Sequence, residues 1–304
     1  MSDPVKTVAI VGCGTVGASW AALLLAHGID VQATDPAPEA ERYLRDFAVR
    51  AGAQLAELGL TGQGRLGFTP RLAEALQGAD FVQENAPEKE ELKQALLAEI
   101  DDLLPPAVIV AGSTSSLLRS RLVVRCRHPG RHITAHPFNP PHLVPLVELV
   151  GEDATVVAQA ADFYRRVGRR PVVLGREMPG HIANRLASAV WREAVYLVEQ
   201  GVASVADIDA AMAYGPGMRW TVMGPHMTYH LGGGPGGIAH YLDHLGASQV
   251  RRWQSLGSPS FDAATRAALV QGVDEEAAGR PVEELEAARD AALIALLKLR
   301  PQIS

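Results

Sequence analysis

The chain lacks the features that would tie it to an oxidising compartment, a membrane or a nucleic acid. It has only two cysteines, Cys13 and Cys126, in 304 residues, which excludes a disulfide framework. It has no run of about 18 apolar residues, and Met1-Ser-Asp-Pro lacks the charged and apolar segments of a signal peptide. The net charge of −6 disfavours nucleic acid as a partner. We therefore expect a cytoplasmic protein that binds neither nucleic acid nor membrane.

The first part of the sequence has the alternation of an α/β protein. From Lys6 to about Leu174, apolar strand-like runs alternate with helical patterns, which predicts a doubly wound parallel sheet. Strands are expected at 7–11, 30–34, 81–84, 108–112, 132–135, 144–150 and 170–174. Helices are expected at about 15–27, 37–59, 71–77, 88–103 and 154–166. Only short connections separate the last strands, so antiparallel pairing is open to them.

The second part reads as helical. After Pro179-Gly180 strand-like runs become scarce, and helices are expected at 181–200, 205–213, 222–232, 236–246, 262–272 and 281–299, with Ser204 and Ser260 as caps. The predicted fold is α/β, with a Rossmann-type doubly wound sheet in residues 1–178 followed by an all-α domain in residues 179–304.

A glycine turn follows the first expected strand and opens the first expected helix. In this G-x-G-x-x-G, Gly12 allows a tight turn, Gly14 lets backbone N–H groups approach a pyrophosphate, and Gly17 lets helix and strand pack closely. The phosphates would lie at the N-terminus of the helix that starts with Thr15 and Val16. A second strand ends in Asp35, 18 residues past Gly17, where an acid suits the ribose hydroxyls of NAD and repels the 2′-phosphate of NADP. The pattern predicts an NAD site; the alternative is a glycine-rich turn with a solvated aspartate.

A histidine and a glutamate frame the loop between two later strands. His136 stands at a strand end and Glu148 lies on the strand that returns beside it. A carboxylate next to a histidine fixes its tautomer and favours the imidazolium, as abstraction of a hydroxyl proton requires. By spacing alone, an unrelated loop histidine is the competing interpretation.

The sequence resembles the 3-hydroxyacyl-CoA dehydrogenase superfamily over essentially its whole length. The resemblance rests on the glycine turn with Asp35, Glu84-Asn-Ala-Pro-Glu88, Ser113-Thr-Ser-Ser-Leu117, His136…Asn139…Glu148 and Pro179-Gly-His-Ile-Ala-Asn-Arg-Leu186. It implies that His136 is the catalytic base, that Glu148 orients it, and that Ser115 and Asn184 contact the substrate oxygen. Glu88 and Asn139 match positions that support the nicotinamide end and the catalytic histidine. The helical domain of the family usually forms a homodimer contact. The alternative for Ser113–Ser116 is a helix cap. The alternative for Asn184 is that its side chain satisfies buried backbone groups.

Within the superfamily the sequence resembles the L-carnitine dehydrogenases, in stretches such as Phe81–Glu88 and Tyr214–Trp220. This resemblance implies a small 3-hydroxy acid as substrate. Residues 36–69 contain no basic cluster for the phosphates of coenzyme A. A quaternary ammonium is held mainly by aromatic faces. The candidate side chains are Trp191, Trp220, Tyr214 and Tyr229. The alternative is that these residues belong to a buried core. A substrate carboxylate would pair with Arg185 or Arg219.

Two histidines depart from the pattern of these relatives. His142 takes the place of a tyrosine in the catalytic loop, and His181 takes the place of a phenylalanine near Asn184. The i,i+4 pairs His226/His230 and His240/His244 have zinc-ligand spacing but no third ligand beside them, so we expect no metal and read them as surface or interface histidines.

Three other functions compete with a carnitine-type NAD-dependent dehydrogenase. One is an L-gulonate 3-dehydrogenase-like enzyme and another a hydroxyacyl-CoA dehydrogenase. The third is a non-catalytic dinucleotide-binding protein of the lambda-crystallin kind, which has no need of His136, Glu148, Ser115 and Asn184 together.

Overall fold

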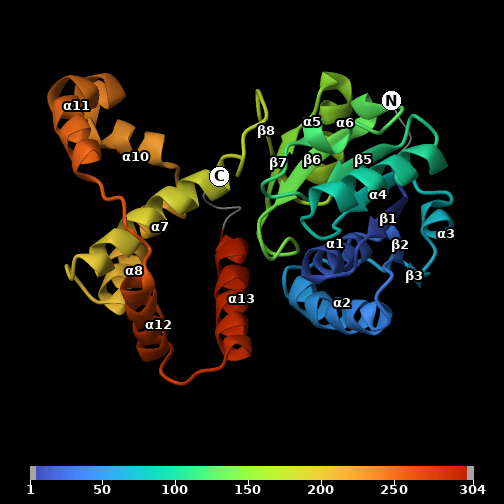
Figure 1. The fold of residues 1–304 in the computed structure, drawn as a ribbon, viewed down its shortest axis with the longest axis horizontal. Helices are drawn as coiled ribbons and strands as arrows, with labels where there is room; N and C mark the ends of the chain where they lie inside the picture. The colour runs from blue at the N-terminus through green and yellow to red at the C-terminus, as the bar shows by residue number, and fades with distance from the viewer. Residues whose placement is uncertain (1–4, 300–304) are drawn as a thin grey trace. The chain divides into compact units, whose positions relative to one another are not determined.

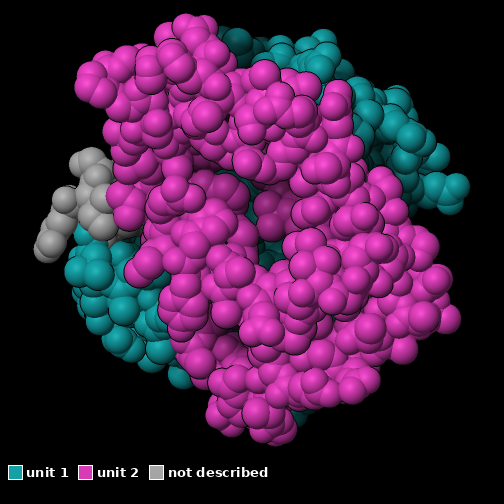
Figure 2. All heavy atoms as spheres, turned by 90° about the vertical axis from the view of Figure 1, so that its left-hand side faces the viewer, with its two compact units in different colours: residues 1–184, 290–301 teal, residues 185–289, 302–304 magenta. Residues whose placement is uncertain are grey.

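The computed structural model describes residues 5–299. The chain divides into two compact units, shown in different colours in Figure 2. The first contains the residues up to Asn184 and the C-terminal segment that begins at Asp290; the second contains Arg185–Arg289.

An eight-stranded sheet is the centre of the first unit (Figure 1). Its strands are β1 (Thr7–Val11), β2 (Asp30–Thr34), β3 (Leu66–Phe68), β4 (Phe81–Glu84), β5 (Ile109–Gly112), β6 (His132–Pro137), β7 (Leu146–Val150) and β8 (Arg170–Val173). They lie in the order β3-β2-β1-β4-β5-β6-β7-β8. The first six in this order are parallel, and their order is that of a Rossmann sheet. β7 pairs antiparallel with β6, and β8 runs parallel to β7.

Helices cover both faces of this sheet, as the buried apolar runs of the central strands require. They are α1 (Thr15–Ala26), α2 (Ala40–Glu57), α3 (Leu72–Leu76), α4 (Glu90–Leu103), α5 (Arg119–Leu122) and α6 (Ala154–Arg166). In β1, Val8 and Ile10 belong to a core shared with α1, α2 and α6. Their neighbours Ala9 and Val11 belong to a second core, shared with α3, α4 and α5. This alternation covers both faces of the sheet. Because the strands from β3 to β6 are parallel, their carboxyl ends lie at one edge of the sheet.

Two short elements of this unit were not expected from the sequence. β3 has three half-buried residues and pairs with β2. α5 has four residues and starts at Arg119, so the alternative that Ser113–Ser116 caps a helix after β5 is wrong. These residues form a loop instead.

Between residues 183 and 299 the regular elements are helices, as expected. The helices are α7 (Ala183–Glu199), α8 (Val205–Tyr214), α9 (Pro216–Trp220), α10 (Pro225–Gly232), α11 (Gly237–Ser255), α12 (Ala263–Ala277) and α13 (Val282–Leu299). Ser204 caps α8 by accepting the N–H of Asp207 at 3.1 Å. The cap of α12 is Asp262, which accepts the N–H of Thr265, and the expected Ser260 cap is therefore wrong. Among residues 5–299 no helix combines the length and the apolar character needed to cross a bilayer.

Candidate active site

The glycine turn has no room for side chains where it meets the sheet. Gly12 has φ +91°, and a Cβ there would lie 2.7 Å from the carbonyl carbon of Asn85. A Cβ at Gly17 would lie 1.9 Å from the carbonyl oxygen of Gly12. A Cβ at Gly14 would meet nothing within 4 Å. The turn is thus closed toward the protein at Gly12 and Gly17 and open at Gly14, where a pyrophosphate would approach.

α1 starts directly after this open position. Its N-cap is Gly14, which brings no side chain to the N–H groups of the first turn, and Thr15 is exposed while Val16 is half-buried. Unpaired N–H groups at a helix N-terminus attract anions. The backbone at this end of α1 therefore fits a phosphate.

Asp35 follows the end of β2, next to the glycine turn. Its Oδ2 accepts the N–H of Cys13 at 2.8 Å and its Oδ1 accepts the N–H of Ala37 at 2.9 Å. Each carboxylate oxygen has a further lone pair, which suits two ribose hydroxyl donors.

The His136–Glu148 pair is set by the register of the sheet. β6 and β7 are antiparallel and place these two residues directly opposite each other. Directly opposed side chains on one face of an antiparallel pair are in contact range, and here the Nδ1 of His136 lies 2.9 Å from the Oε2 of Glu148. Both residues are buried. The twelve-residue spacing is the length of the hairpin that joins them.

The start of α7 holds the other oxygen of Glu148. Oε1 accepts the N–H of Ile182 at 2.8 Å and of Ala183 at 3.0 Å. Burial by itself raises the pKa of Glu148, but the hydrogen bonds from His136 and from these two N–H groups outweigh it and keep the pKa below its usual value. Glu148 is therefore a carboxylate, which can only accept, so His136 carries its proton on Nδ1. The unprotonated Nε2 of His136 is an acceptor, and it faces the Nδ2 of Asn184 at 3.5 Å.

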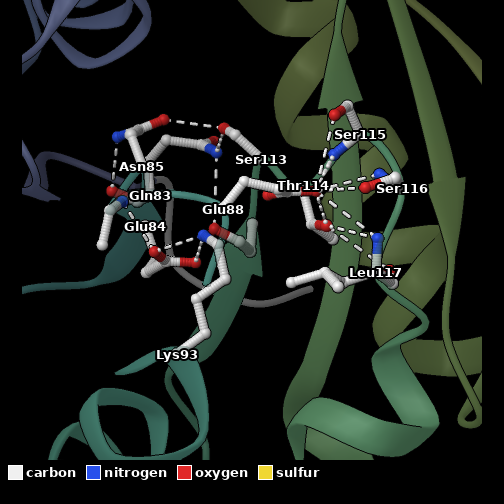
Figure 3. A network of polar contacts seen from close by, with 12 residues as sticks. Gln83, Glu84, Asn85, Glu88, Lys93, Ser113, Thr114, Ser115, Ser116 and Leu117 are labelled. Carbon is white, nitrogen blue, oxygen red and sulfur yellow. Dashed lines mark hydrogen bonds and ion pairs between the residues drawn. The ribbon is translucent and has the colours of Figure 1, made fainter. Parts of the chain in front are cut away.

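Glu88 organises the loop after β5 (Figure 3). Its Oε1 lies 2.6 Å from the Thr114 hydroxyl and accepts the N–H groups of Ser115 and Ser116 at 3.0 and 2.9 Å. Burial raises the pKa of Glu88, but the hydrogen bonds from Thr114 and Ser116 together with the charge of Lys93 lower it overall. The hydroxyl of Ser115 also faces this carboxylate, at 3.4 Å. The expected substrate-contacting serine is thus held on a loop wrapped around Glu88.

A buried polar network that the sequence did not reveal supports this edge of the sheet (Figure 3). The Nζ of Lys93, on α4, lies 2.7 Å from the Oε1 of Glu84 at the end of β4, and both side chains are at most 1% exposed. Gln83 donates to the hydroxyl of Ser113 at 2.9 Å, and Ser113 donates to the Oδ1 of Asn85 at 2.7 Å. The run Glu90–Lys93 reads as a solvated helical face, and nothing in its spacing marks Lys93 as buried.

The loop between β6 and β7 contains two further predicted positions. Asn139 is exposed after β6 and precedes a cis peptide bond to Pro140. His142 is buried, with Nδ1 2.7 Å from the hydroxyl of Ser19 on α1 and Nε2 2.8 Å from the Oε1 of Gln54 on α2. The residue that departs from the carnitine dehydrogenase pattern therefore ties this loop to the helices of the nucleotide-binding unit.

The side chains considered for a quaternary ammonium and a carboxylate belong to the second unit. The four aromatic candidates are exposed, from 37% for Trp220 to 82% for Tyr214, so the alternative that they form a buried core is wrong. Arg185 and Arg219 are exposed as well. The rings of His240 and His244 have centroids 4.0 Å apart and planes tilted by 33°.

A Rossmann sheet, a glycine turn open to a pyrophosphate and an acid that suits ribose hydroxyls define a dinucleotide-dependent dehydrogenase. The model of the NAD binding domain of 3-hydroxyacyl-CoA dehydrogenase matches residues 7–178, and that of the C-terminal domain of the same enzymes matches residues 180–260. The chain belongs to the 3-hydroxyacyl-CoA dehydrogenase family, and it is an NAD-dependent 3-hydroxy-acid dehydrogenase that acts on a CH–OH group.

Curated relatives resemble the chain over nearly its whole length. An L-carnitine dehydrogenase of Nocardiopsis dassonvillei is 47% identical over 99% of this chain and 93% of its own. An L-carnitine dehydrogenase of Streptomyces griseus subsp. griseus is 46% identical over 97% and 90%. Among solved structures, an NAD+-dependent dismutase, 5-formyl-3-hydroxy-2-methylpyridine 4-carboxylic acid 5-dehydrogenase, superposes with a TM-score of 0.84 at 30% identity, over 97% of this chain and 98% of its own.

Proposed function

We propose that this enzyme oxidises the 3-hydroxyl of a small 3-hydroxy acid of the L-carnitine type to the 3-keto acid, with His136 as the general base and Glu148 as its orienting partner. The observation that carries the proposal is the geometry of this pair. One oxygen of Glu148 holds the Nδ1–H of His136, and the other accepts N–H groups at the start of α7. The unprotonated Nε2, which lies 3.5 Å from the Nδ2 of Asn184, can accept a hydroxyl proton.

The reaction removes a hydride and a proton from one carbinol group. When bound, NAD accepts the hydride from C3. The hydroxyl proton passes to Nε2 of His136 while the C–O bond becomes a carbonyl, and the imidazolium so formed is stabilised by the Glu148 carboxylate 2.9 Å from Nδ1. The site thus balances the charge that the base acquires.

Further residues position the reacting oxygen and the cofactor. Ser115 and Asn184 donate to the substrate oxygen, whose charge changes during the transfer. Glu88 and Asn139 support the nicotinamide end, and the cofactor is held by Gly12, Gly14, Thr15, Val16, Gly17 and Asp35. The 3.5 Å between Nδ2 of Asn184 and Nε2 of His136 supports this role for Asn184, because one hydroxyl oxygen can contact both atoms.

The substrate class rests on the curated relatives. Eight L-carnitine dehydrogenases are 38% to 47% identical over at least 96% of the chain. The exposed aromatic side chains Trp191, Trp220, Tyr214 and Tyr229 are available as cation–π partners for a trimethylammonium group.

The test is a substrate panel with a matched pair of variants. L-carnitine, L-gulonate, 3-hydroxybutyrate and its CoA ester are each assayed for NADH and NADPH formation. We expect activity with L-carnitine and NAD, abolished by His136→Ala and retained by His128→Ala, which removes an exposed histidine of the same unit. A higher kcat/KM for the CoA ester than for L-carnitine would contradict the proposed substrate class. Full activity of His136→Ala, with NAD binding intact, would contradict the role of His136.

We also propose that residues 179–304 form the substrate and dimerisation domain of a homodimer. α11 and α12 expose large apolar side chains, among them Leu242, Trp253, Val270 and Val273, and exposed apolar area of this kind is costly to leave in water. Light scattering after gel filtration tests the dimer, and a mass of 32.3 kDa in solution would contradict it.

A further inference from the structure

His181 lies against the proposed base, on the turn between β8 and α7. Its ring centroid is 4.8 Å from that of His136, and the two ring planes are 32° apart. The backbone of His181 is left-handed, with φ 49°, and its N–H donates to the carbonyl of Met178 at 2.9 Å. Only 3% of the residue is exposed. This turn therefore holds the imidazole of His181 next to the ring of His136.

The hydrogen bond of His181 assigns its tautomer. Nε2 lies 3.1 Å from the carbonyl oxygen of Thr114, which can only accept, so Nε2 carries the proton. Nδ1 is buried and has no hydrogen-bond partner among residues 5–299. Protonating it would place a donor without an acceptor beside His136, and burial together with His136 lowers the pKa of His181, against the opposing effects of Thr114 and of the carboxylates Glu148 and Glu88. His181 is thus protonated on Nε2, whereas the Glu148 carboxylate faces a proton on Nδ1 of the adjacent His136.

This hydrogen bond joins two parts of the site. On one side is the loop after β5, in which Thr114 and Ser115 are bound to Glu88. On the other side is the segment whose next residues, Ile182 and Ala183, donate their N–H groups to Glu148. One imidazole thus connects the loop of the substrate-contacting serine with the carboxylate that orients the base.

We propose that His181 is a positioning residue, which sets the separation between Ser115 and Nε2 of His136 through the bond from its Nε2–H to the carbonyl of Thr114. The proposal rests on the proposed roles of His136 and Ser115. A hydride transfer needs the hydroxyl oxygen, the serine and the base in one fixed geometry, and small displacements reduce kcat strongly.

Three substitutions separate the hydrogen bond from the ring. The amide nitrogen of glutamine reaches the position of Nε2, whereas that of asparagine reaches only the position of Nδ1. Phenylalanine keeps an aromatic ring and has no donor. Asparagine also adopts a left-handed backbone more readily than glutamine, so backbone preference works against the expected order.

We expect His181→Gln to keep kcat within about threefold of the unmodified enzyme, and His181→Asn and His181→Phe to lose about tenfold, the effect of one hydrogen bond. The dissociation constant for NAD, measured by fluorescence, should be unchanged in all three. Full kcat in the asparagine and phenylalanine variants, or an equal loss in the glutamine variant, would overturn the proposal.

A spectroscopic measurement on the unmodified enzyme tests the tautomer of His181 directly. It needs no activity assay and does not depend on whether a variant folds. In ¹⁵N-histidine spectra at pH 7, His181 should be the neutral Nε2–H form; a protonated or Nδ1–H His181 would overturn the proposal. If His136→Ala is fully active, the proposed function fails. If His136→Ala is inactive while every His181 variant is unimpaired, only the role of His181 fails.

Discussion

Replacing Glu148 with glutamine should reverse the tautomer of His136 while leaving the shape of the site unchanged. The carboxylate accepts three hydrogen bonds, two at Oε1 from Ile182 and Ala183 and one at Oε2 from His136. An amide has only one accepting oxygen. That oxygen should face the two N–H groups, because an NH₂ there would meet two donors. The NH₂ group then faces Nδ1 of His136, which must become the acceptor, and the proton moves to Nε2.

The cost of this change follows from the hydrogen bonds. To act as a base in the Glu148→Gln variant, His136 must return its proton to Nδ1, which then faces the NH₂ group. Two buried donors are left without acceptors, at about 1–3 kcal/mol each, or about 4 kcal/mol together. Because each 1.4 kcal/mol is about tenfold in rate, kcat should fall by roughly 10³-fold. A tautomer reversal in the Ser-His-Asp triad costs about 10⁴-fold, which is of the same order.

The assay compares kcat, KM and NAD affinity for Glu148→Gln and for Glu152→Gln, an exposed glutamate near the end of β7. The control should retain its kcat and both variants should bind NAD. A shift of the His136 resonances from the Nδ1–H to the Nε2–H form should accompany the loss of activity. If kcat of Glu148→Gln stays within about threefold of the unmodified enzyme, the carboxylate does not set the tautomer, and the base must be reassigned.

Three other predictions follow from the nucleotide-binding unit. Gly14→Ala should fold normally and lose NAD affinity, whereas Gly17→Ala, whose Cβ would lie 1.9 Å from a carbonyl oxygen, should lower the melting temperature; the opposite pattern would contradict the assigned open and closed sides of the turn. Asp35→Ser should reduce kcat/KM with NAD by about tenfold and bring it closer to kcat/KM with NADP. An unchanged ratio of these two values would argue against a contact between Asp35 and the ribose hydroxyls. Burial raises the pKa of Asp101, but accepted hydrogen bonds, led by that from His132, hold it well below 3.8, so its contribution to unfolding free energy is complete above about pH 5 and is lost as the pH falls. The free energy of unfolding, measured with urea, should therefore decrease more steeply from pH 5 to pH 3 in the unmodified protein than in the Asp101→Asn variant.

The sheet was predictable because its central strands are continuous apolar runs ending at residues of distinctive chemistry. β1, β2 and β4 have the expected bounds. The pairing of His136 with Glu148 was also accessible, since a short hairpin places residues twelve apart on facing strands. β3 was missed because its three residues, at the edge of the sheet, are only half-buried and give no apolar run.

The polar contacts were not predictable, since they join residues that are distant in the sequence. His142 is a departure from a family pattern when read in the sequence, but its partners Ser19 and Gln54 lie 123 and 88 positions away. The same holds for the Ser113–Leu117 loop, whose hydroxyl and amide groups match a helix cap but bind the carboxylate of Glu88 instead. Residue type identifies a donor, and only the fold decides which acceptor it meets.

Glu148 shows how the fold makes the proposed base independent of nearby basic side chains. A buried carboxylate would normally be protonated unless a cation or several donors hold its charge. Here two N–H groups at the start of α7 supply those donors, and the positive end of the helix dipole adds to them. The carboxylate remains ionised and can orient His136 before substrate arrives. The N–H groups at the start of α7 therefore set the tautomer of the proposed base through Glu148. His181, just before this turn, joins the loop of Ser115 to the same turn through its hydrogen bond to the carbonyl of Thr114.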